Sequence, residues 1–232
     1  MAQETQIDQL SDQLNQLLEQ RQWAEGIPLV DQLATLDSEK RKEYQLLKAL
    51  LQNLSSGPVE IPDPPASIRQ FQRPTEIKGC ESDPDCFRAA AQQCQPSRFT
   101  YIQSTNIFGV ISTCFHVVEI WGETENQCIT LETCPINQVG LSDEMEAMIR
   151  QQGDPAFIEE LKSYVSDETV EYICRYPGSD NIGKFHTRQG TVGYSPEVAA
   201  FGEIMTTEYL LDDEVVANCE SVEPAAEPPI MQ

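Results

Sequence analysis

The sequence predicts an α+β protein: a helical unit, a Pro-rich linker, and then a disulfide-stapled antiparallel sheet with helices on one face. Apolar residues recur at helical spacing in the first 54 residues, whereas from residue 97 onward the spacing becomes that of strands. Seven of the eight cysteines lie between residues 80 and 174. We expect four segments: a helical unit over 1–54, the linker over 55–79, a cysteine-rich α+β domain over 80–217 and an acidic, Pro-rich tail over 218–232.

Three short amphipathic helices account for the first segment. One carries Ile7 and a leucine stripe, and the others cover 26–36 and 38–54, with Pro28 tolerated in a first turn. The leucines of the stripe are Leu10, Leu14, Leu17 and Leu18. Because each helix is too amphipathic to stand alone, we expect them to pack antiparallel around one apolar seam.

Residues 10–39 resemble a degenerate tetratricopeptide repeat. The pattern departs where Ser38 replaces the usual Pro, and it does not continue beyond Pro58. The resemblance implies an antiparallel helical hairpin and a protein–protein contact surface, and the alternatives are a plain three-helix cap and self-association. The positions that carry the likeness are Leu10, Leu14, Leu17, Trp23, Gly26, Val30 and Leu33, and all except Gly26 are our candidate interaction residues.

The linker and the tail are both rich in proline. Residues 55–79 hold five prolines without sustained periodicity, which favours extended chain over a helix or central strand. The tail is also acidic, so we expect it to be disordered, except where a disulfide at Cys219 would hold its first residues.

The stretch GCESDPDCFRAAAQQC (79–94) predicts a helix that begins at Pro84 behind an Asp83 cap and ends near Cys94. Cys86 and Cys94 would then lie about 12 Å apart along one helix axis. This separation exceeds the disulfide limit of about 7 Å and the span of one zinc site, so the two sulfurs must have different partners.

Strands are predicted over 97–104, 109–121 and 127–136. We favour a hairpin in which Cys114 faces Cys134, a register that pairs His116 with Glu132. This register separates a packed face from a more polar one.

Further along the chain we expect helices over 142–153 and 154–165 and a strand over 168–177. The four glycines between 178 and 193 favour an irregular loop or hairpin, and Ser195–Pro196 favours the start of a helix that ends near Leu211.

Residues 80–175 resemble small cysteine-bearing domains of uncharacterised envelope or secreted proteins of bacteria and archaea. The likeness rests on CESDPDCFRAAAQQC, STCF and QCITLETC. It implies export and disulfide bonds, and it implies no particular activity.

Eight cysteines suit a fully oxidised set, with on the order of a hundred possible pairings, and Cys114–Cys134 is the favoured one. Reduced, buried thiols in a cytosolic protein are the alternative. The spacing matches no common zinc pattern, and the acidic surroundings oppose a reactive thiolate, so we expect neither a metal nor a cofactor. The expected disulfide cysteines are Cys80, Cys86, Cys94, Cys114, Cys128, Cys134, Cys174 and Cys219.

The residues that could support catalysis are few. His116 follows Cys114 by two positions on one strand, so the two side chains could form a Cys–His pair. His186 lies in the glycine-rich segment, where we expect it to be solvated. The acidic clusters at 81–85 and 210–214 lack the spacing of a calcium loop, so only weak Ca²⁺ binding is conceivable. We therefore predict no catalytic residues.

The composition limits the partners. With 38 acidic and 15 basic residues the net charge is −23, which opposes nucleic-acid and anionic-lipid binding and suits a basic protein partner or self-association. We see no transmembrane run and no signal peptide in the sequence as given.

Three functions follow from these observations. The first is a non-enzymatic extracytoplasmic interaction or structural protein (periplasmic, cell-surface or secreted), provided that a signal peptide was removed. The second is a secreted hydrolase or thiol-redox enzyme with a site near His116 or in 178–195. The third is a cytosolic, tetratricopeptide-like adaptor.

Overall fold

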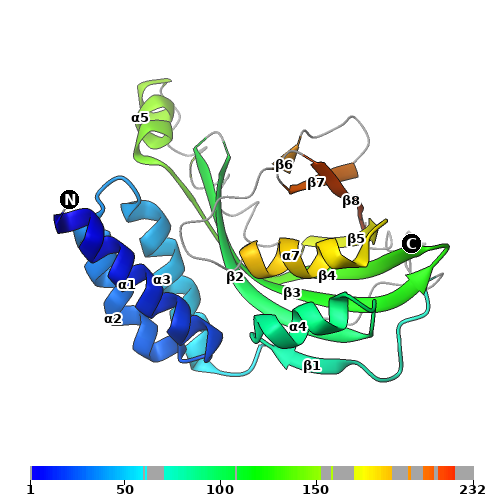
Figure 1. Cartoon of the computed structure of the whole chain (residues 1–232). Helices are drawn as coiled ribbons and strands as arrows, with labels where there is room; N and C mark the ends of the chain where they lie inside the picture. Colours follow the sequence, from blue (N-terminus) through cyan, green and yellow to red (C-terminus); the bar gives the residue numbers. More distant parts are fainter. Residues whose placement is uncertain are drawn as a thin grey trace, which may run out of the picture.

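The computed structural model describes a helical unit followed by a sheet, which confirms the α+β class (Figure 1). It describes residues 2–59, 61, 71–107, 109–152, 158, 170–189, 198–199, 206–211 and 214–222. Within these residues the strands form one eight-stranded sheet in the order β1-β2-β3-β4-β5-β8-β7-β6.

The helical unit consists of α1 (Ala2–Glu19), α2 (Trp23–Leu36) and α3 (Arg41–Ser56), as the apolar spacing predicts. α2 begins three residues earlier than expected, so Pro28 lies inside the helix rather than in its first turn. A proline there removes one backbone hydrogen bond. The buried residues of this helix, Gly26, Val30 and Leu33, compensate by packing into the seam.

This unit packs on one face of the sheet, against Ile102, Phe115 and Val117 (Figure 1). Trp23 meets Phe115 edge-on, with ring centroids 6.1 Å apart. Most of the candidate interaction residues are buried in the seam between these helices and the sheet. The buried ones are Leu10, Leu14, Val30 and Leu33, and the half-buried ones are Leu17 and Trp23. These six residues therefore pack within the chain, and a role for them in binding a partner stays a prediction.

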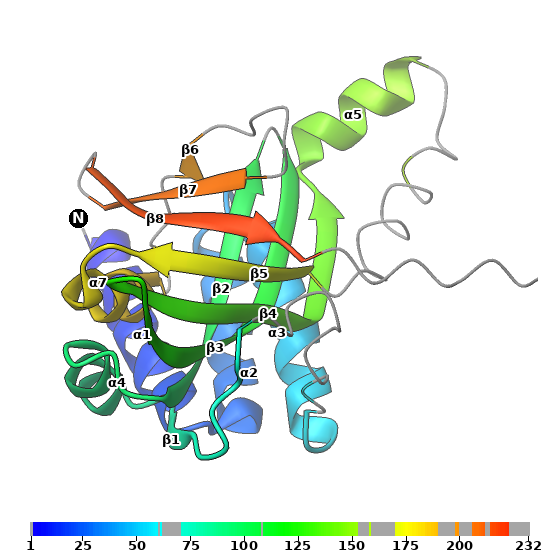
Figure 2. The same cartoon turned by 90° about the vertical axis from the view of Figure 1, so that its right-hand side faces the viewer.

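The strands are β1 (Lys78–Glu81), β2 (Ser97–Ile107), β3 (Val110–Thr124), β4 (Gln127–Leu141), β5 (Val170–Tyr176), β6 (Val198–Ala199), β7 (Thr206–Leu211) and β8 (Glu214–Ser221). The sheet is antiparallel apart from the short β1, which pairs with β2 in parallel. β5, β8 and β7 follow one another across it, with β6 at the edge (Figure 2).

The β3–β4 register differs from the prediction by two residues near Glu132 and by three near Cys114. Val118, rather than His116, lies opposite Glu132, and Cys114 lies opposite Asn137. The tight turn at Glu125–Asn126 sets this register, because it pairs Thr124 with Gln127, and a bulge between Phe115 and Val117 adds one residue on β4. Cys114 and Cys134 still lie close enough to bond, with their Cα atoms 5.9 Å apart.

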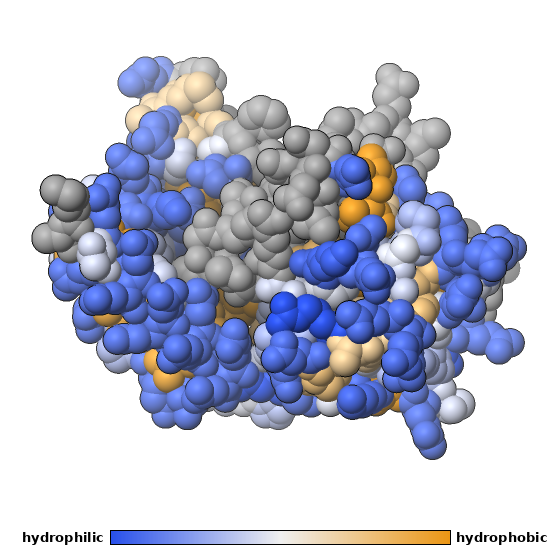
Figure 3. Space-filling view, in the orientation of Figure 1, coloured by the Kyte–Doolittle hydropathy of each residue, from blue (hydrophilic) through white to orange (hydrophobic). Residues whose placement is uncertain are grey.

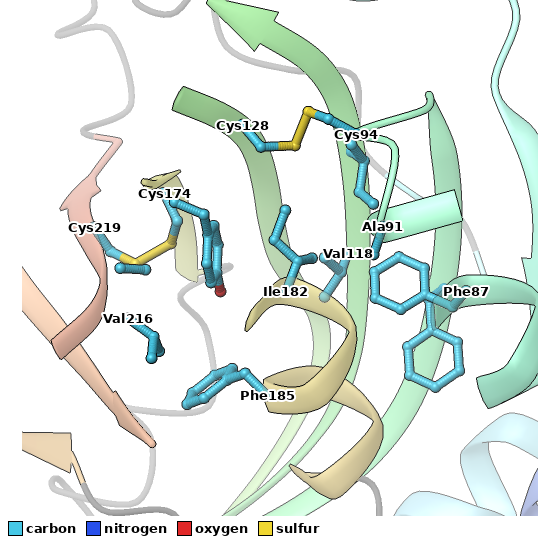
Figure 4. Close-up of a cluster of buried hydrophobic side chains, with 14 of the residues drawn as sticks. Phe87, Ala91, Cys94, Val118, Cys128, Cys174, Ile182, Phe185, Val216 and Cys219 are labelled. Carbon is cyan, nitrogen blue, oxygen red and sulfur yellow. A yellow bond between two sulfur atoms is a disulfide. The ribbon is translucent and has the colours of Figure 1, made fainter. Parts of the chain in front are cut away.

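Two helices, α4 (Pro84–Ala91) and α7 (Ser179–Gln189), cover the other face of the sheet. Asp83 caps α4 as predicted, because its carboxylate accepts hydrogen bonds from the backbone N–H groups of Asp85 and Cys86. Figure 4 shows Ile182 of α7 near Val118 and Phe185 of α7 near Val216, within the same core cluster as Phe87 of α4.

In the last third of the sequence, some predicted elements are present and others have a different secondary structure. α5 (Asp143–Gln152) forms with Ser142 at its start, whereas only Ile158 of the predicted 154–165 helix is among the described residues. Residues 179–189 are helical rather than a loop, and β6 and β7 replace the helix expected over 195–211. β8 extends to Ser221, beyond the expected start of the tail at 218, because Cys219 pairs with Cys174.

The described part of the linker packs on the sheet. Val59 and Ile61 join the seam of the helical unit, and Phe71 lies against the cluster around Trp121. The guanidinium of Arg73 donates to the buried carboxylate of Glu119, with Nε–Oε2 and Nη2–Oε1 distances of 3.1 and 2.9 Å. This segment is therefore anchored to the sheet at defined points.

Replacing Gly183 with alanine is expected to destabilise the fold by about 1–2 kcal/mol. An added Cβ would lie 3.0 Å from the Cα and Cγ of Arg88, so α7 would have to move away from α4. Urea denaturation measures the loss. The matched control is Lys184→Ala on the exposed side of α7, which is expected to change stability by less than about 0.5 kcal/mol. Equal losses would contradict close helix contact at Gly183.

Candidate functional site

All eight cysteines form disulfides, and no free thiol is left. Cys86 and Cys94 have different partners, as predicted, although α4 ends at Ala91 rather than near Cys94. The predicted Cys114–Cys134 bond is present. Figure 4 shows two of the four bonds, one at the end of α4 and one between β5 and β8. The complete set is Cys80–Cys86, Cys94–Cys128, Cys114–Cys134 and Cys174–Cys219.

One group of potential metal ligands occurs among the described residues, formed by Glu132, Cys174 and Cys219 within 4.8 Å of one another. The two sulfurs are bonded to each other and are not thiolates, which are the form that binds metals. This arrangement therefore offers one carboxylate rather than a ligand set.

A polar network is buried between the sheet and α7. His186 of α7 is fully buried, and its Nε2 lies 3.1 Å from Oε1 of Glu132 and 2.8 Å from the hydroxyl of Tyr176. Its Nδ1 lies 3.1 Å from the hydroxyl of Tyr101. The prediction that His186 is solvated is therefore wrong, because its segment is a helix that packs on the sheet.

The carboxylate of Glu132 lies at the centre of this network. It accepts hydrogen bonds from Thr130 Oγ1 at 3.1 Å and from the hydroxyl of Tyr176 at 3.3 Å. The two ring nitrogens of His186 complete the network, since Nε2 lies within hydrogen-bond distance of Glu132 and Tyr176 and Nδ1 within that of Tyr101. Buried polar groups that are mutually satisfied in this way stabilise one arrangement of the core.

His116 lies beside the network and stacks on Tyr101, with ring centroids 4.9 Å apart and planes at 14°. It is half-buried. Burial lowers the pKa of His116 to about 4, and His186 adds to this effect while Glu132 opposes it. The imidazole is therefore neutral at pH 7. The conceivable Cys–His dyad is absent, because Cys114 is in a disulfide.

The protein is expected to lose about 2 kcal/mol of stability between pH 7.5 and pH 5 through His116. In the unfolded chain His116 takes up a proton near its ordinary pKa of 6.5, whereas in the folded chain it does so only near pH 4. The unfolded state therefore gains more protons as the pH falls. Urea titrations across this range measure the loss, and His116→Gln should flatten the pH dependence. An unchanged slope in that variant would contradict the buried, neutral imidazole.

The network has the residue types of an acid–base site but not its access. His186 and Tyr176 are fully buried, and Glu132 is 3% exposed. Burial also raises the pKa of Tyr101 well above its ordinary value, so its hydroxyl stays protonated. A general base must come within hydrogen-bond reach of its substrate, and here the helix α7 covers the imidazole of His186. The geometry favours a structural role.

A groove of about 150 Å³ opens next to this network. Its walls come from the end of α1, the start of α2, the β1–α4 connection, β2 and α7. Tyr101 belongs to both features, because its ring lines the groove and its hydroxyl contacts His186. The lining residues are Asn15, Leu18, Glu19, Trp23, Ser82, Pro84, Phe99, Thr100, Tyr101, Ile102 and Thr187.

The acidic cluster at 81–85 makes contacts that a calcium ion would have to replace. Glu81 pairs with Arg21, Asp83 caps α4, and Asp85 pairs with Arg88 at 2.5 Å. The second cluster, at 210–214, lies partly outside the described residues.

The network was not predicted from the sequence, although a signal for it exists. Ile182, Phe185 and His186 have helical spacing, which places the imidazole on the apolar side of a helix. The four nearby glycines favour a loop instead of a helix, so the sequence does not predict that His186 is buried. The groove has no such signal, because five separate elements form it.

The chain matches no known protein family, no curated protein and no solved structure. Among the described residues no helix is both long and apolar enough to cross a membrane.

Proposed function

We propose that this protein is a non-enzymatic extracytoplasmic protein that acts by binding another protein or as part of an assembly. The observation that carries the proposal is the pairing of all eight cysteines in four disulfides. Disulfides persist in oxidising compartments and are rare in the cytosol. The resemblance of residues 80–175 to envelope domains agrees with this location.

Two features support binding rather than catalysis. The Glu132–His186 pair is enclosed by the core, and the groove beside it is lined by hydroxyl, amide, carboxylate and aromatic groups. These groups recognise a ligand without forming a nucleophile and base.

A hydrolase is the second candidate, because His186 lies in the 178–195 segment and its Nε2 is 3.1 Å from Glu132. It would require α7 to move away from the sheet. A helix without this packing unfolds more readily, which lets its amides exchange faster, so hydrogen exchange measures the loss of packing. We expect strong protection at Ile182–His186, and rapid exchange there would favour the hydrolase.

The proposed location can be tested by fractionating the cells that produce the chain after their free thiols have been blocked. We expect the chain in an extracytoplasmic fraction with its cysteines unmodified by the blocking reagent. Recovery from the cytoplasm with blocked thiols would overturn the proposal and favour the cytosolic adaptor.

A further inference from the structure

The groove between the helical unit and the sheet combines one carboxylate with aromatic and apolar walls. Glu19 stands at the end of α1, and Trp23 opens α2 after a short turn. Phe99 and Tyr101 contribute ring surface from β2. An amphipathic cation requires this combination, since its stem packs on apolar groups and its head is attracted to carboxylates and aromatic faces.

The charges around the groove favour a cation over an anion. Arg21 pairs with Glu81, and Arg88 pairs with Asp85. Glu19 forms no ion pair with the described residues, so its charge is uncompensated at the rim.

The wider surface adds to this preference, because the whole chain carries a net charge of −23. Figure 3 shows a predominantly hydrophilic surface over the helical unit that forms one wall of the groove. It is the net negative charge that steers basic partners and repels acidic ones.

The polar groups of the groove distinguish arginine from lysine. The hydroxyl of Thr100 is fully used, because it accepts from Arg21 and Ser82 and donates to the carbonyl of Glu81. Thr187 donates its own proton to the carbonyl of Gly183. The hydroxyl oxygens of Ser82 and Thr187 still accept hydrogen bonds. A guanidinium presents several donors in one plane and stacks on aromatic faces, whereas an ammonium is a compact point charge.

We propose that this groove binds the arginine side chain of a basic partner protein, with the guanidinium between Glu19 and the indole of Trp23. The inference rests on the proposed binding function and names the chemistry of the partner. A volume of about 150 Å³ accepts one long side chain and is smaller than the pockets of about 300–1,000 Å³ that hold drug-sized ligands. The arginine is therefore an anchor within a larger contact.

The two tryptophans of the chain permit a direct test. Trp23 lines the groove, while Trp121 is buried and donates its indole N–H to Glu119, which makes it an internal reference. The oxidised full-length chain, labelled with ¹⁵N, would be titrated with N-acetyl-arginine amide, and Trp23→Phe assigns the two indole signals. As the arginine probe is added, we expect the indole N–H signal of Trp23 to shift until binding saturates. The indole N–H signal of Trp121 should stay fixed.

Two controls isolate the charge. N-acetyl-citrulline amide has nearly the same shape as the arginine probe without its charge, and it is expected to bind at least about threefold more weakly. Glu19→Gln should weaken arginine binding by a similar factor. Glu25→Gln, which removes the same charge from an exposed position outside the groove lining, should leave binding unchanged.

An unmoved Trp23 signal, or equal binding of arginine and citrulline probes, would overturn the arginine site. Equal weakening by the two glutamine variants would also overturn it, because the attraction would then be the general field of the surface. None of these results changes the fractionation outcome, so failure of the groove and failure of the proposed location are distinguishable.

Discussion

Replacing Cys174 and Cys219 together with alanine is expected to lower the free energy of unfolding by about 4 kcal/mol. The bond joins β5 to β8 and closes a loop with a sequence separation of 45. Without it the unfolded chain regains the entropy that this loop had lost. Urea denaturation of the non-reduced protein measures the difference.

The matched control is the pair Cys80→Ala and Cys86→Ala, whose bond spans a sequence separation of 6. The same chain-entropy argument gives a loss of about 2 kcal/mol for so short a loop. The two double variants should therefore differ by about 2 kcal/mol. Equal losses would contradict the assignment of the long loop to Cys174–Cys219.

Replacing Glu119 with alanine is expected to destabilise the protein by about 3–5 kcal/mol. Glu119 is 2% exposed, and its carboxylate accepts hydrogen bonds from Arg73, Arg98 and the indole of Trp121. Burial alone would raise the pKa of Glu119, but its hydrogen bonds to Arg73, Trp121 and Arg98 outweigh burial and lower it. Removing the carboxylate leaves two guanidiniums beside an apolar cluster. Chemical denaturation at pH 7 tests the expectation.

Glu220→Ala is the control, because the carboxylate of Glu220 also meets an arginine, at 2.7 Å from Arg175, but is exposed. Exposed pairs contribute about 0–1 kcal/mol, so this variant should remain close to the parent protein. A loss for Glu119→Ala no larger than that for Glu220→Ala would show that the linker is not anchored through Glu119.

Local signals were sufficient to predict much of this fold. The Asp83–Pro84 pair correctly marks the start of α4, and helix geometry correctly separates the partners of Cys86 and Cys94. The Cys114–Cys134 bond was also predictable, because strand alternation fixes which residues share a face.

Features that depend on tertiary contacts were not predictable in the same way. The two-residue turn at Glu125–Asn126 and the bulge beside Phe115 set the β3–β4 register, which strand alternation alone cannot determine. Gly183 suggested a loop, but its missing side chain serves the close approach of α7 to α4. The leucine seam of the helical unit suggested a partner surface, whereas its partner is the sheet of the same chain.

Four disulfides fasten α4 and its flanking segments to the sheet and join its strands, and we propose that this framework belongs to an extracytoplasmic binding protein. Peptide mapping by mass spectrometry, with proteolysis at acidic pH and without reductant, tests this framework most directly. We expect four linked peptide pairs, which are Cys80–Cys86, Cys94–Cys128, Cys114–Cys134 and Cys174–Cys219. Free thiols, or a different pairing in the native protein, would contradict it.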